Sequence, residues 1–206
     1  FYAYFLKQTG IDHPLRGEVL GHQEQSAEKV IQELTRCQTY KPYLFLKNMP
    51  HHMLDLDLDF VKHFQNFFLI REPREMIASY LQKREEVKME DLGLDVQYEL
   101  FTSLAEHGTK PPVIDSRTLL EHPREVLTEL CKRLEIPFKE GMLEWPSGPI
   151  PQDGKWAPHW YANVHASTGF GKPKQEEEVD IPMELEDLAQ ACDGYYHAMK
   201  KHEIRP

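Results

Sequence analysis

One arginine and one serine have the spacing that a phosphate-binding pair would need. Arg71 directly follows the apolar run Asn66–Ile70, and Ser79 comes eight positions later, on the second turn of a helix predicted to begin at Pro73. Arginine presents a planar, charged fork that matches phosphate oxygens, and a serine hydroxyl adds a hydrogen-bond donor beside it. The pattern therefore indicates an anion site. An arginine paired with a nearby acid, together with a solvent-facing serine, would give the same sequence.

A lysine and two histidines follow another apolar run, Tyr43–Leu46. Beside an anionic donor, Lys47 could stabilise a developing negative charge, and His51 or His52 could take a proton from an acceptor hydroxyl. Histidine suits that role because its ordinary pKa lies near neutrality. The same residues would also suit an ordinary surface loop. The acids that follow show no recognised metal-ligand spacing, so we expect no metal.

The stretch Trp145–Glu178 differs in composition from the rest of the chain, because it is rich in proline and contains all three tryptophans. It shows too little apolar periodicity to predict a helix. We expect a long ordered loop, and long loops in compact domains are often functional. Its tryptophans could stack on an adenine ring or an apolar acceptor, or they could hold the loop against the core.

Short apolar runs alternate with helical patterns along the chain. The runs predict buried parallel strands at Tyr43–Leu46, Asn66–Ile70 and Pro112–Asp115. The helices are predicted at Glu24–Cys37, after Pro73, after Pro123 and at Leu185–Met199. This alternation predicts an α/β fold with a parallel sheet, in which ligands bind beyond the carboxyl ends of the strands. Chemistry is therefore expected at Lys47–His52, Arg71–Ser79 and Asp115–Arg117, although the last pair is explained more simply as a helix start.

The composition of the chain limits the kinds of partner it can have. Its 206 residues carry a formal net charge of −10, whereas a broad polyanion-binding surface needs excess lysine and arginine. We therefore expect no nucleic-acid partner. No apolar run approaches the roughly 20 residues of a membrane-spanning helix, so no membrane partner is expected either. Cys37, Cys131 and Cys192 lie in helical apolar patterns and are predicted to be reduced core residues, which favours a cytoplasmic location.

Taken together, these residues resemble the sulfotransferase family that uses 3'-phosphoadenosine 5'-phosphosulfate (PAPS) as donor. In that family an arginine at a strand end and a serine eight positions later hold the 3'-phosphate, which is the role the resemblance implies for Arg71 and Ser79. The segment Lys47–His52 resembles the strand end that carries the family's catalytic lysine and base. The position two after the lysine is Met49 here, and either of the two later histidines could be the base.

The resemblance also implies a cofactor-binding loop late in the chain, because the family closes a Gly-Lys loop over the 3'-phosphate. Gly154-Lys155 and Gly171-Lys172 both have that sequence, and the pair beside Trp156 is favoured. Gly154, Lys155 and Trp156 are therefore expected to bind PAPS. A further likeness is Leu130–Phe138, which is similar to the end of the helix that follows the family's third strand.

The tail from Met142 to Phe170 is similar to one branch of that family, found as stand-alone bacterial proteins and beside aminotransferase-like domains in plants. The resemblance implies a single domain, residues 1–206, containing the loop 145–178. It also implies a three-layer parallel sheet of the P-loop nucleotide-binding type. No phosphate-loop sequence such as Gly-x-x-x-x-Gly-Lys-Ser/Thr occurs here, so we expect this chain to lack the first strand and the phosphate loop.

The activity that the resemblance implies is transfer of a sulfuryl group from PAPS to a hydroxyl or amine of a small-molecule or carbohydrate acceptor, without a metal. One alternative is a catalytically inactive sulfotransferase-like module for binding or assembly, favoured by the missing phosphate loop and the displaced histidine. A relative of the P-loop kinases is disfavoured, because those enzymes need metal-holding acids near a phosphate loop and an arginine-rich lid.

Overall fold

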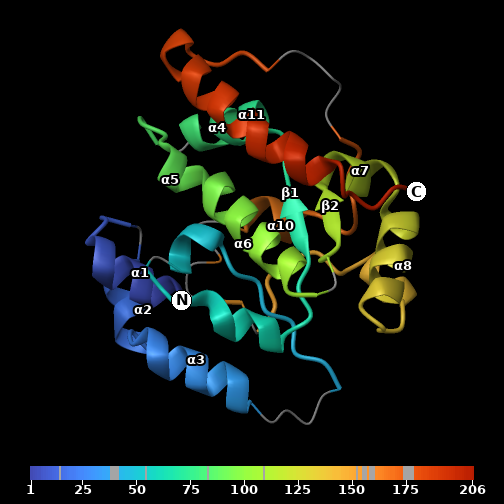
Figure 1. Cartoon of the computed structure of the whole chain (residues 1–206), viewed down its shortest axis with the longest axis horizontal. Coiled ribbons are helices and arrows are strands. Elements are labelled where there is room, and N and C mark those ends of the chain that lie inside the picture. The colour runs from blue at the N-terminus through green and yellow to red at the C-terminus, as the bar shows by residue number, and fades with distance from the viewer. Residues whose placement is uncertain are drawn as a thin grey trace. The chain divides into compact units, whose positions relative to one another are not determined.

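The computed structural model describes residues 1–13, 15–37, 42–53, 55–82, 84–108, 110–151, 153–154, 157, 161–173 and 179–206. The chain divides into two compact units (Figure 1). The first, called the helical unit here, comprises Phe1–Phe64 and Pro146–Thr168. The second, called the sheet unit, comprises Gln65–Trp145 and Gly169–Pro206.

Two parallel strands form the centre of the sheet unit (Figure 1). Strand β1, Phe68–Ile70, pairs with β2, Val113–Asp115, so that Ile70 lies opposite Asp115. Both strands come from the predicted apolar runs. Parallel neighbours need a long crossover, and α4 (Pro73–Leu81), α5 (Met89–Leu92) and α6 (Leu94–Glu106) supply it. The carboxyl ends of β1 and β2 therefore meet at one edge of the sheet.

Local sequence explains where α4 begins and which side of it is buried. The Glu72 carboxylate accepts a hydrogen bond from the Glu75 backbone N–H at 2.8 Å, and Pro73 occupies the first turn, where a missing N–H does no harm. Ile77 is fully buried in a cluster with Leu94 and Cys192. The opposite side of α4 thus stays available at the sheet edge.

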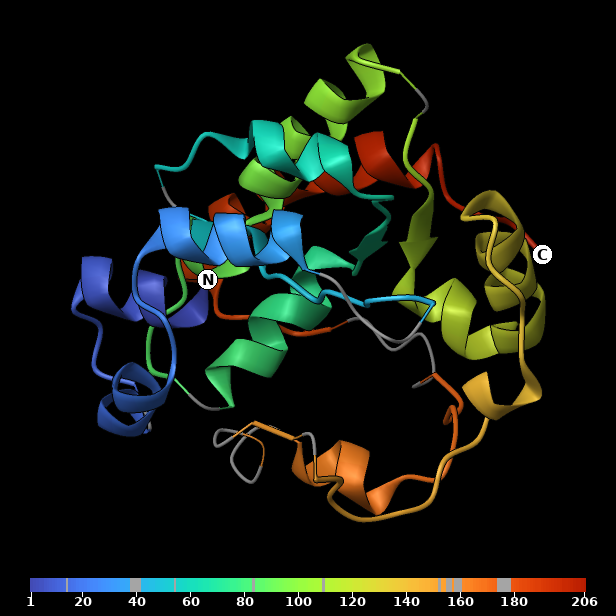
Figure 2. The same ribbon diagram turned by 90° about the horizontal axis from the view of Figure 1, so that it is seen from below.

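Three further helices complete the sheet unit. Helix α7 (Ser116–Glu121) follows β2 directly, and α8 (Pro123–Arg133) packs Val126 and Leu130 against Ile114 of β2. Helix α11 (Glu186–Lys200) lies along α4, α6 and the sheet (Figures 1 and 2). The backbone N–H of Ile204 donates to the Val113 carbonyl at 2.8 Å, which ties the chain end to β2. Two short 3-10 helices, Glu140–Met142 and Met183–Leu185, connect these elements.

The helical unit contains α1 (Tyr2–Thr9), α2 (Arg16–His22), α3 (Ala27–Arg36) and the short α10 (Ala162–Ala166). Its 3-10 helices η1 and η2 span Pro50–Met53 and Leu58–His63. Ala3, Leu6 and Val19 form a small apolar cluster between α1 and α2. The Ser26 side chain caps α3 by accepting from the Lys29 backbone N–H at 3.3 Å.

The prediction of a buried strand at Tyr43–Leu46 is wrong. This segment is not a strand, and Phe45 is 72% exposed. A strand needs a hydrogen-bonded neighbour, and no strand among the described residues pairs with this one. Within that part of the chain the sheet has the two strands β1 and β2, so the structure is a mixed helix and sheet fold with a small parallel sheet.

The three cysteines are free thiols, but they do not share one environment. Cys131 and Cys192 are buried, as predicted for core residues. Cys37 is exposed, so its assignment to the core is wrong: α3 ends at Arg36, and Cys37 is the cap that follows it. None of the helices among the described residues is both long and apolar enough to cross a membrane.

Candidate functional site

A cleft of about 500 Å³ opens at the carboxyl ends of β1 and β2. Its walls come from the first turns after each strand and from the last turns of α11. The charged and polar side chains that shape it include Glu72, Glu75, Asp115, Arg117, Tyr196 and Lys200. This is the edge at which ligands bind in parallel α/β sheets. All of these residues belong to the sheet unit.

Two arginines, one from each strand end, share a single carboxylate at this edge. Arg71 Nε donates to Glu75 Oε2 at 3.1 Å, and Arg117 Nη2 donates to Glu75 Oε1 at 2.7 Å. The side chain of Arg71 is 46% exposed. Because Ile70 and Asp115 are paired across the sheet, the residues just beyond them are brought side by side. The sequence places Arg117 in a stretch where chemistry is expected but favours a helix start for it; its contact with Glu75 follows from the parallel pairing of the two strands.

Ser79 lies on the same side of α4 as Glu75, because residues four apart in a helix are neighbours on its surface. Glu75 and Ser79 thus lie along one side of α4, opposite the buried Ile77, and Arg71, which precedes the helix, contacts Glu75. Ser79 is half-buried. Within the part of the chain that the structure describes, its hydroxyl makes no hydrogen bond. The predicted pair of Arg71 and Ser79 is therefore brought to one surface, with a carboxylate between them.

Asp115 anchors the floor of the cleft. Its side chain is 1% exposed, and its Oδ1 accepts from the backbone N–H groups of Arg117 at 3.0 Å and Thr118 at 3.2 Å. These bonds confirm that Asp115 starts a helix, as the sequence predicted. Its Oδ2 accepts from the Tyr196 hydroxyl at 2.8 Å, and that hydroxyl accepts from Lys200 Nζ at 2.7 Å. Burial and the hydrogen bond to Asp115 raise the pKa of Tyr196 well above its usual value, so this phenol is neutral.

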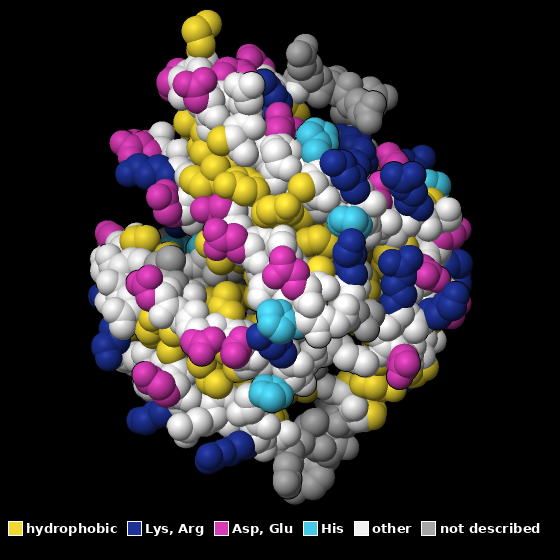
Figure 3. Space-filling model, viewed as in Figure 1, with side chains coloured by type: hydrophobic (Ala, Val, Ile, Leu, Met, Phe, Trp, Pro, Cys, Tyr) yellow, Lys and Arg dark blue, Asp and Glu magenta, His cyan; other side chains and the backbone are white. Residues whose placement is uncertain are grey.

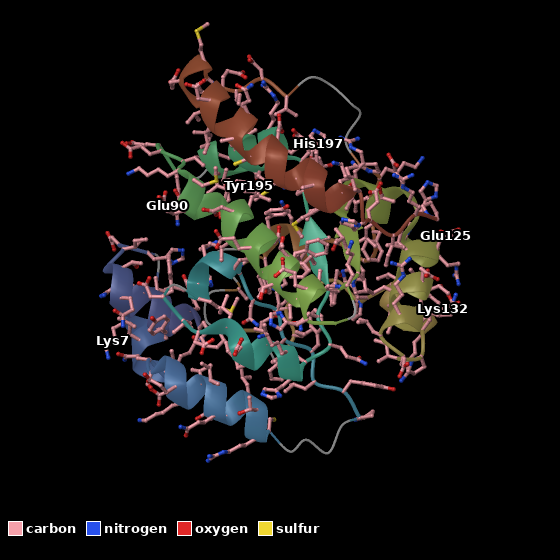
Figure 4. The ribbon with its side chains drawn as sticks, viewed as in Figure 1. Lys7, Glu90, Glu125, Lys132, Tyr195 and His197 are labelled. Carbon is pink, nitrogen blue, oxygen red and sulfur yellow. The ribbon has the colours of Figure 1, made fainter. Side chains whose placement is uncertain are left out.

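Helix α11 presents different side chains to the core and to the cleft. Figure 4 shows Tyr195 and His197 leaving opposite sides of this helix. The Tyr195 ring packs against that of Tyr98 on α6, with centroids 5.6 Å apart, whereas His197 lines the cleft. On the face drawn in Figure 3, Lys and Arg side chains gather over α7, α8 and the end of α11. A chain with an overall negative charge thus gathers many of its basic side chains on one part of this face.

The predicted catalytic residues Lys47, His51 and His52 lie in the helical unit, and Lys47 is exposed. His52 packs against two aromatic rings, with its centroid 5.1 Å from that of Tyr2 and 4.8 Å from that of Phe5. Burial, and then the neighbouring His51, lower the pKa of His52 to about 3. His52 is therefore neutral near pH 7, and its protonated form is strongly disfavoured.

A tyrosine–histidine contact that the sequence did not indicate lies beside these rings. The Tyr2 hydroxyl is 2.5 Å from Nδ1 of His13, and His13 is buried. Because Tyr2 also stacks on His52, these side chains form one aromatic group at the start of α1. No periodic pattern in the sequence links position 2 to position 13, so sequence reasoning had no means of finding it.

Of the predicted cofactor loop, Gly154 is described, while Lys155 and Trp156 lie outside the described residues. The Gly154 carbonyl accepts from the Ala157 backbone N–H at 2.9 Å. Next to it, Asp153 Oδ2 is 2.8 Å from His165 Nε2 and accepts from the Ile150 backbone N–H at 3.0 Å. That backbone hydrogen bond, above all, lowers the pKa of Asp153. The Asp153 side chain thereby connects the backbone at Ile150 to the side chain of His165.

Replacing Asp153 by asparagine is expected to loosen this contact without unfolding the chain. The amide keeps the size of the carboxylate but weakens both hydrogen bonds, since charged acceptors bind more strongly. Amide hydrogen exchange measured by mass spectrometry should become faster in the peptide containing Ile150. Peptides from α8 serve as the control and should exchange at the same rate in the variant and in the original chain. An unchanged exchange rate in the Ile150 peptide would contradict the proposed contribution of Asp153 to this contact.

Among the described residues, no group of three His, Cys, Asp or Glu side chains is arranged to hold a metal ion. The cleft carries both signs of charge: its lining includes the basic side chains Arg74, Arg117 and Lys200 and the acidic side chains Glu72, Glu75 and Asp115. At the edge of this cleft, two guanidinium groups converge on the single carboxylate of Glu75, and an arginine pair of this kind suits the binding of an anion.

The comparisons with known proteins agree with that chemistry. The family described as a sulfotransferase domain matches residues 1–203. The chain is similar to two Arabidopsis thaliana proteins, branched-chain-amino-acid aminotransferase-like protein 2 (36% identical) and protein 1 (38% identical), each over 98% of this chain. It spans 36% of each relative, about a third of their length. No solved structure matches significantly. The predicted resemblance is confirmed, and the chain belongs to the sulfotransferase domain family.

Proposed function

We propose that the protein to which this chain belongs transfers a sulfuryl group from PAPS to a hydroxyl or amine of a small-molecule or carbohydrate acceptor. The observation that carries the proposal is the common surface of Arg71 and Ser79 at the carboxyl end of β1. In this proposal the two side chains bind the 3'-phosphate of the donor. An arginine and a hydroxyl beside a strand end offer charge-assisted and neutral hydrogen bonds to the same phosphate.

Sulfuryl transfer, like phosphoryl transfer, is an in-line displacement in which positioning and charge stabilisation do most of the work. In this proposal Lys47 stabilises the charge on the transferred group. His51 is favoured over His52 as the base, because the pKa of His52, about 3, makes it a weak proton acceptor near pH 7. The roles of Gly154, Lys155 and Trp156 at the donor stay predictions from the family resemblance.

The proposal extends to the fold. The β1–β2 pair, joined by a helical crossover, is the arrangement expected in a three-layer parallel sheet of the P-loop type. Leu69 of β1 is exposed, which is compatible with a further layer or strand covering it in a larger sheet. We infer that β1 and β2 are part of such a sheet.

A second candidate function is a binding module that holds the product nucleotide without transferring sulfate. The low pKa of His52 favours it, because a histidine that does not take up a proton near pH 7 cannot act as the base of a transfer reaction. A transfer assay with radiolabelled PAPS and pools of phenols, amines and sugars separates the two functions. Labelled acceptor supports the enzyme, whereas nucleotide binding without labelled acceptor supports the module.

Replacing Arg71 by alanine is expected to weaken binding of adenosine 3',5'-bisphosphate at least tenfold, because a charge-assisted phosphate contact is lost. Isothermal titration calorimetry measures the change. Arg133→Ala is a matched control: Arg133 is similarly exposed and pairs with Glu129 four residues away, as Arg71 pairs with Glu75. An Arg71→Ala variant that binds within threefold of the original chain would contradict the phosphate role.

A further inference from the structure

We propose that Arg117 is a second phosphate-binding arginine of this site and that Glu75 occupies the phosphate position until a dianion displaces it. The inference rests on the proposed function and adds a binding residue and a specificity-determining residue to it. Its basis is the single carboxylate held between Arg71 and Arg117 at the mouth of the cleft.

The geometry around Glu75 is that of a bound anion. Each of its two oxygens accepts a hydrogen bond from a different guanidinium group, at 3.1 Å from Arg71 and 2.7 Å from Arg117. A phosphate has the same need for donors on more than one oxygen, and guanidinium groups match it in the same way. The internal carboxylate therefore marks the position where an external phosphate would be bound.

The surroundings allow this exchange. The side chains of Glu75 and Arg117 are 21% and 25% exposed and line an open cleft, so Glu75 can rotate into water. The pair is partly buried, but the incoming phosphate takes over both guanidinium groups, so the rotation of Glu75 leaves neither arginine unpaired. Ser79 lies one turn further along α4 and supplies a hydroxyl on the same side. By contrast, Asp115 is almost fully buried and is bound by backbone and side-chain groups, so it cannot leave in this way.

Displacement of a carboxylate sets a charge requirement on the ligand. A monoanion that replaces Glu75 exchanges one negative charge for another and gains little electrostatic energy. A phosphate monoester carries close to two negative charges above its second pKa of about 6, and so it binds both arginines more strongly than the carboxylate does. Glu75 would thus select terminal phosphates, such as the 3'-phosphate of the donor, over phosphodiesters and carboxylates.

The decisive variant is Glu75→Gln, which keeps the shape of the side chain and removes its charge. We expect adenosine 3',5'-bisphosphate to bind at least fivefold more tightly to it than to the original chain in calorimetric titrations. Glu129→Gln is the matched control, because it removes the same charge from another arginine partner, Arg133, away from the cleft. The affinity of Glu129→Gln for adenosine 3',5'-bisphosphate should stay within twofold of that of the original chain. Equal or weaker binding by Glu75→Gln would overturn the role of Glu75.

Arg117→Ala tests the second arginine, and it is expected to lose at least tenfold in affinity while Arg133→Ala does not. Unchanged binding in Arg117→Ala together with weakened binding in Arg71→Ala would overturn this inference and leave the proposed function standing. Unchanged binding in both would contradict the phosphate site itself. If Glu75→Gln does not fold, Glu75→Asp serves, since the shorter carboxylate reaches both arginines poorly and should raise the affinity at least twofold; an unchanged affinity would overturn the inference.

Discussion

Replacing Asp115 by alanine is expected to lower the free energy of unfolding by about 3 kcal/mol, because the change removes two kinds of interaction at once. The carboxylate caps α7 through the backbone N–H groups of Arg117 and Thr118. Loss of a helix cap typically costs about 1 kcal/mol. The same carboxylate accepts from the buried Tyr196 hydroxyl, and a buried donor left without an acceptor costs about 1–3 kcal/mol.

Urea unfolding followed by circular dichroism measures this effect. Asp57→Ala is a suitable comparison, since Asp57 caps η2 through the Asp59 backbone N–H but is exposed. Asp57→Ala should lower the free energy of unfolding by only about 1 kcal/mol. Asp115→Asn keeps an oxygen for the cap, so its loss of unfolding free energy should be smaller than that of Asp115→Ala and larger than that of Asp57→Ala. If Asp115→Ala were no more destabilising than Asp57→Ala, the bond to Tyr196 would contribute nothing to stability.

The cap that Asp115 provides also affects the candidate site, because its hydrogen bonds fix the first turn of α7. Arg117 lies in that turn and contacts Glu75 from there. A single buried acid thus connects the α11 side chains Tyr196 and Lys200 to the arginine at the mouth of the cleft. Loosening of this cap should therefore affect Arg117 more than Arg71, whose position depends on β1 and on α4.

The sequence was informative where local patterns decide the structure. The apolar runs around Phe68–Ile70 and Val113–Asp115 are strands, and the helices after Pro73 and Pro123 begin at those prolines. Each of these elements is bounded by residues that stop or start regular structure locally. The exposed segment Tyr43–Leu46 has an equally apolar sequence, but strand formation there needs a distant partner that the local pattern cannot supply.

The candidate site was predictable only in part, for the same reason. The spacing of Arg71 and Ser79 can be found in the sequence, since both lie within one strand-to-helix connection. The position of Glu75 between Arg71 and Arg117 depends on the register of β1 against β2, which no local pattern fixes. The environment of His52 likewise depends on α1, whose aromatic rings come from the far end of the helical unit's sequence.

Acidification is expected to destabilise the chain through His52. Its pKa is lowered to about 3 in the folded chain, mainly by burial, whereas an unfolded histidine has a pKa of about 6.5. Between these two values the unfolded state binds more protons, so stability rises with pH there. The contribution is fully present above pH ~6.5 and is progressively lost as the pH falls toward 3. Between pH 7.5 and pH 5 the loss from this one group is about 2 kcal/mol.

His52→Phe isolates this contribution, because phenylalanine keeps a ring that can contact Tyr2 and Phe5 but cannot bind a proton. Urea unfolding at pH 7.5 and at pH 5 should show that the variant loses about 2 kcal/mol less than the original chain between the two conditions. His63→Phe is the matched control, since His63 is an exposed histidine of the same unit, and it should leave the pH dependence unchanged. An equal loss in His52→Phe and in the original chain would mean that His52 is hydrated in solution and available as a base.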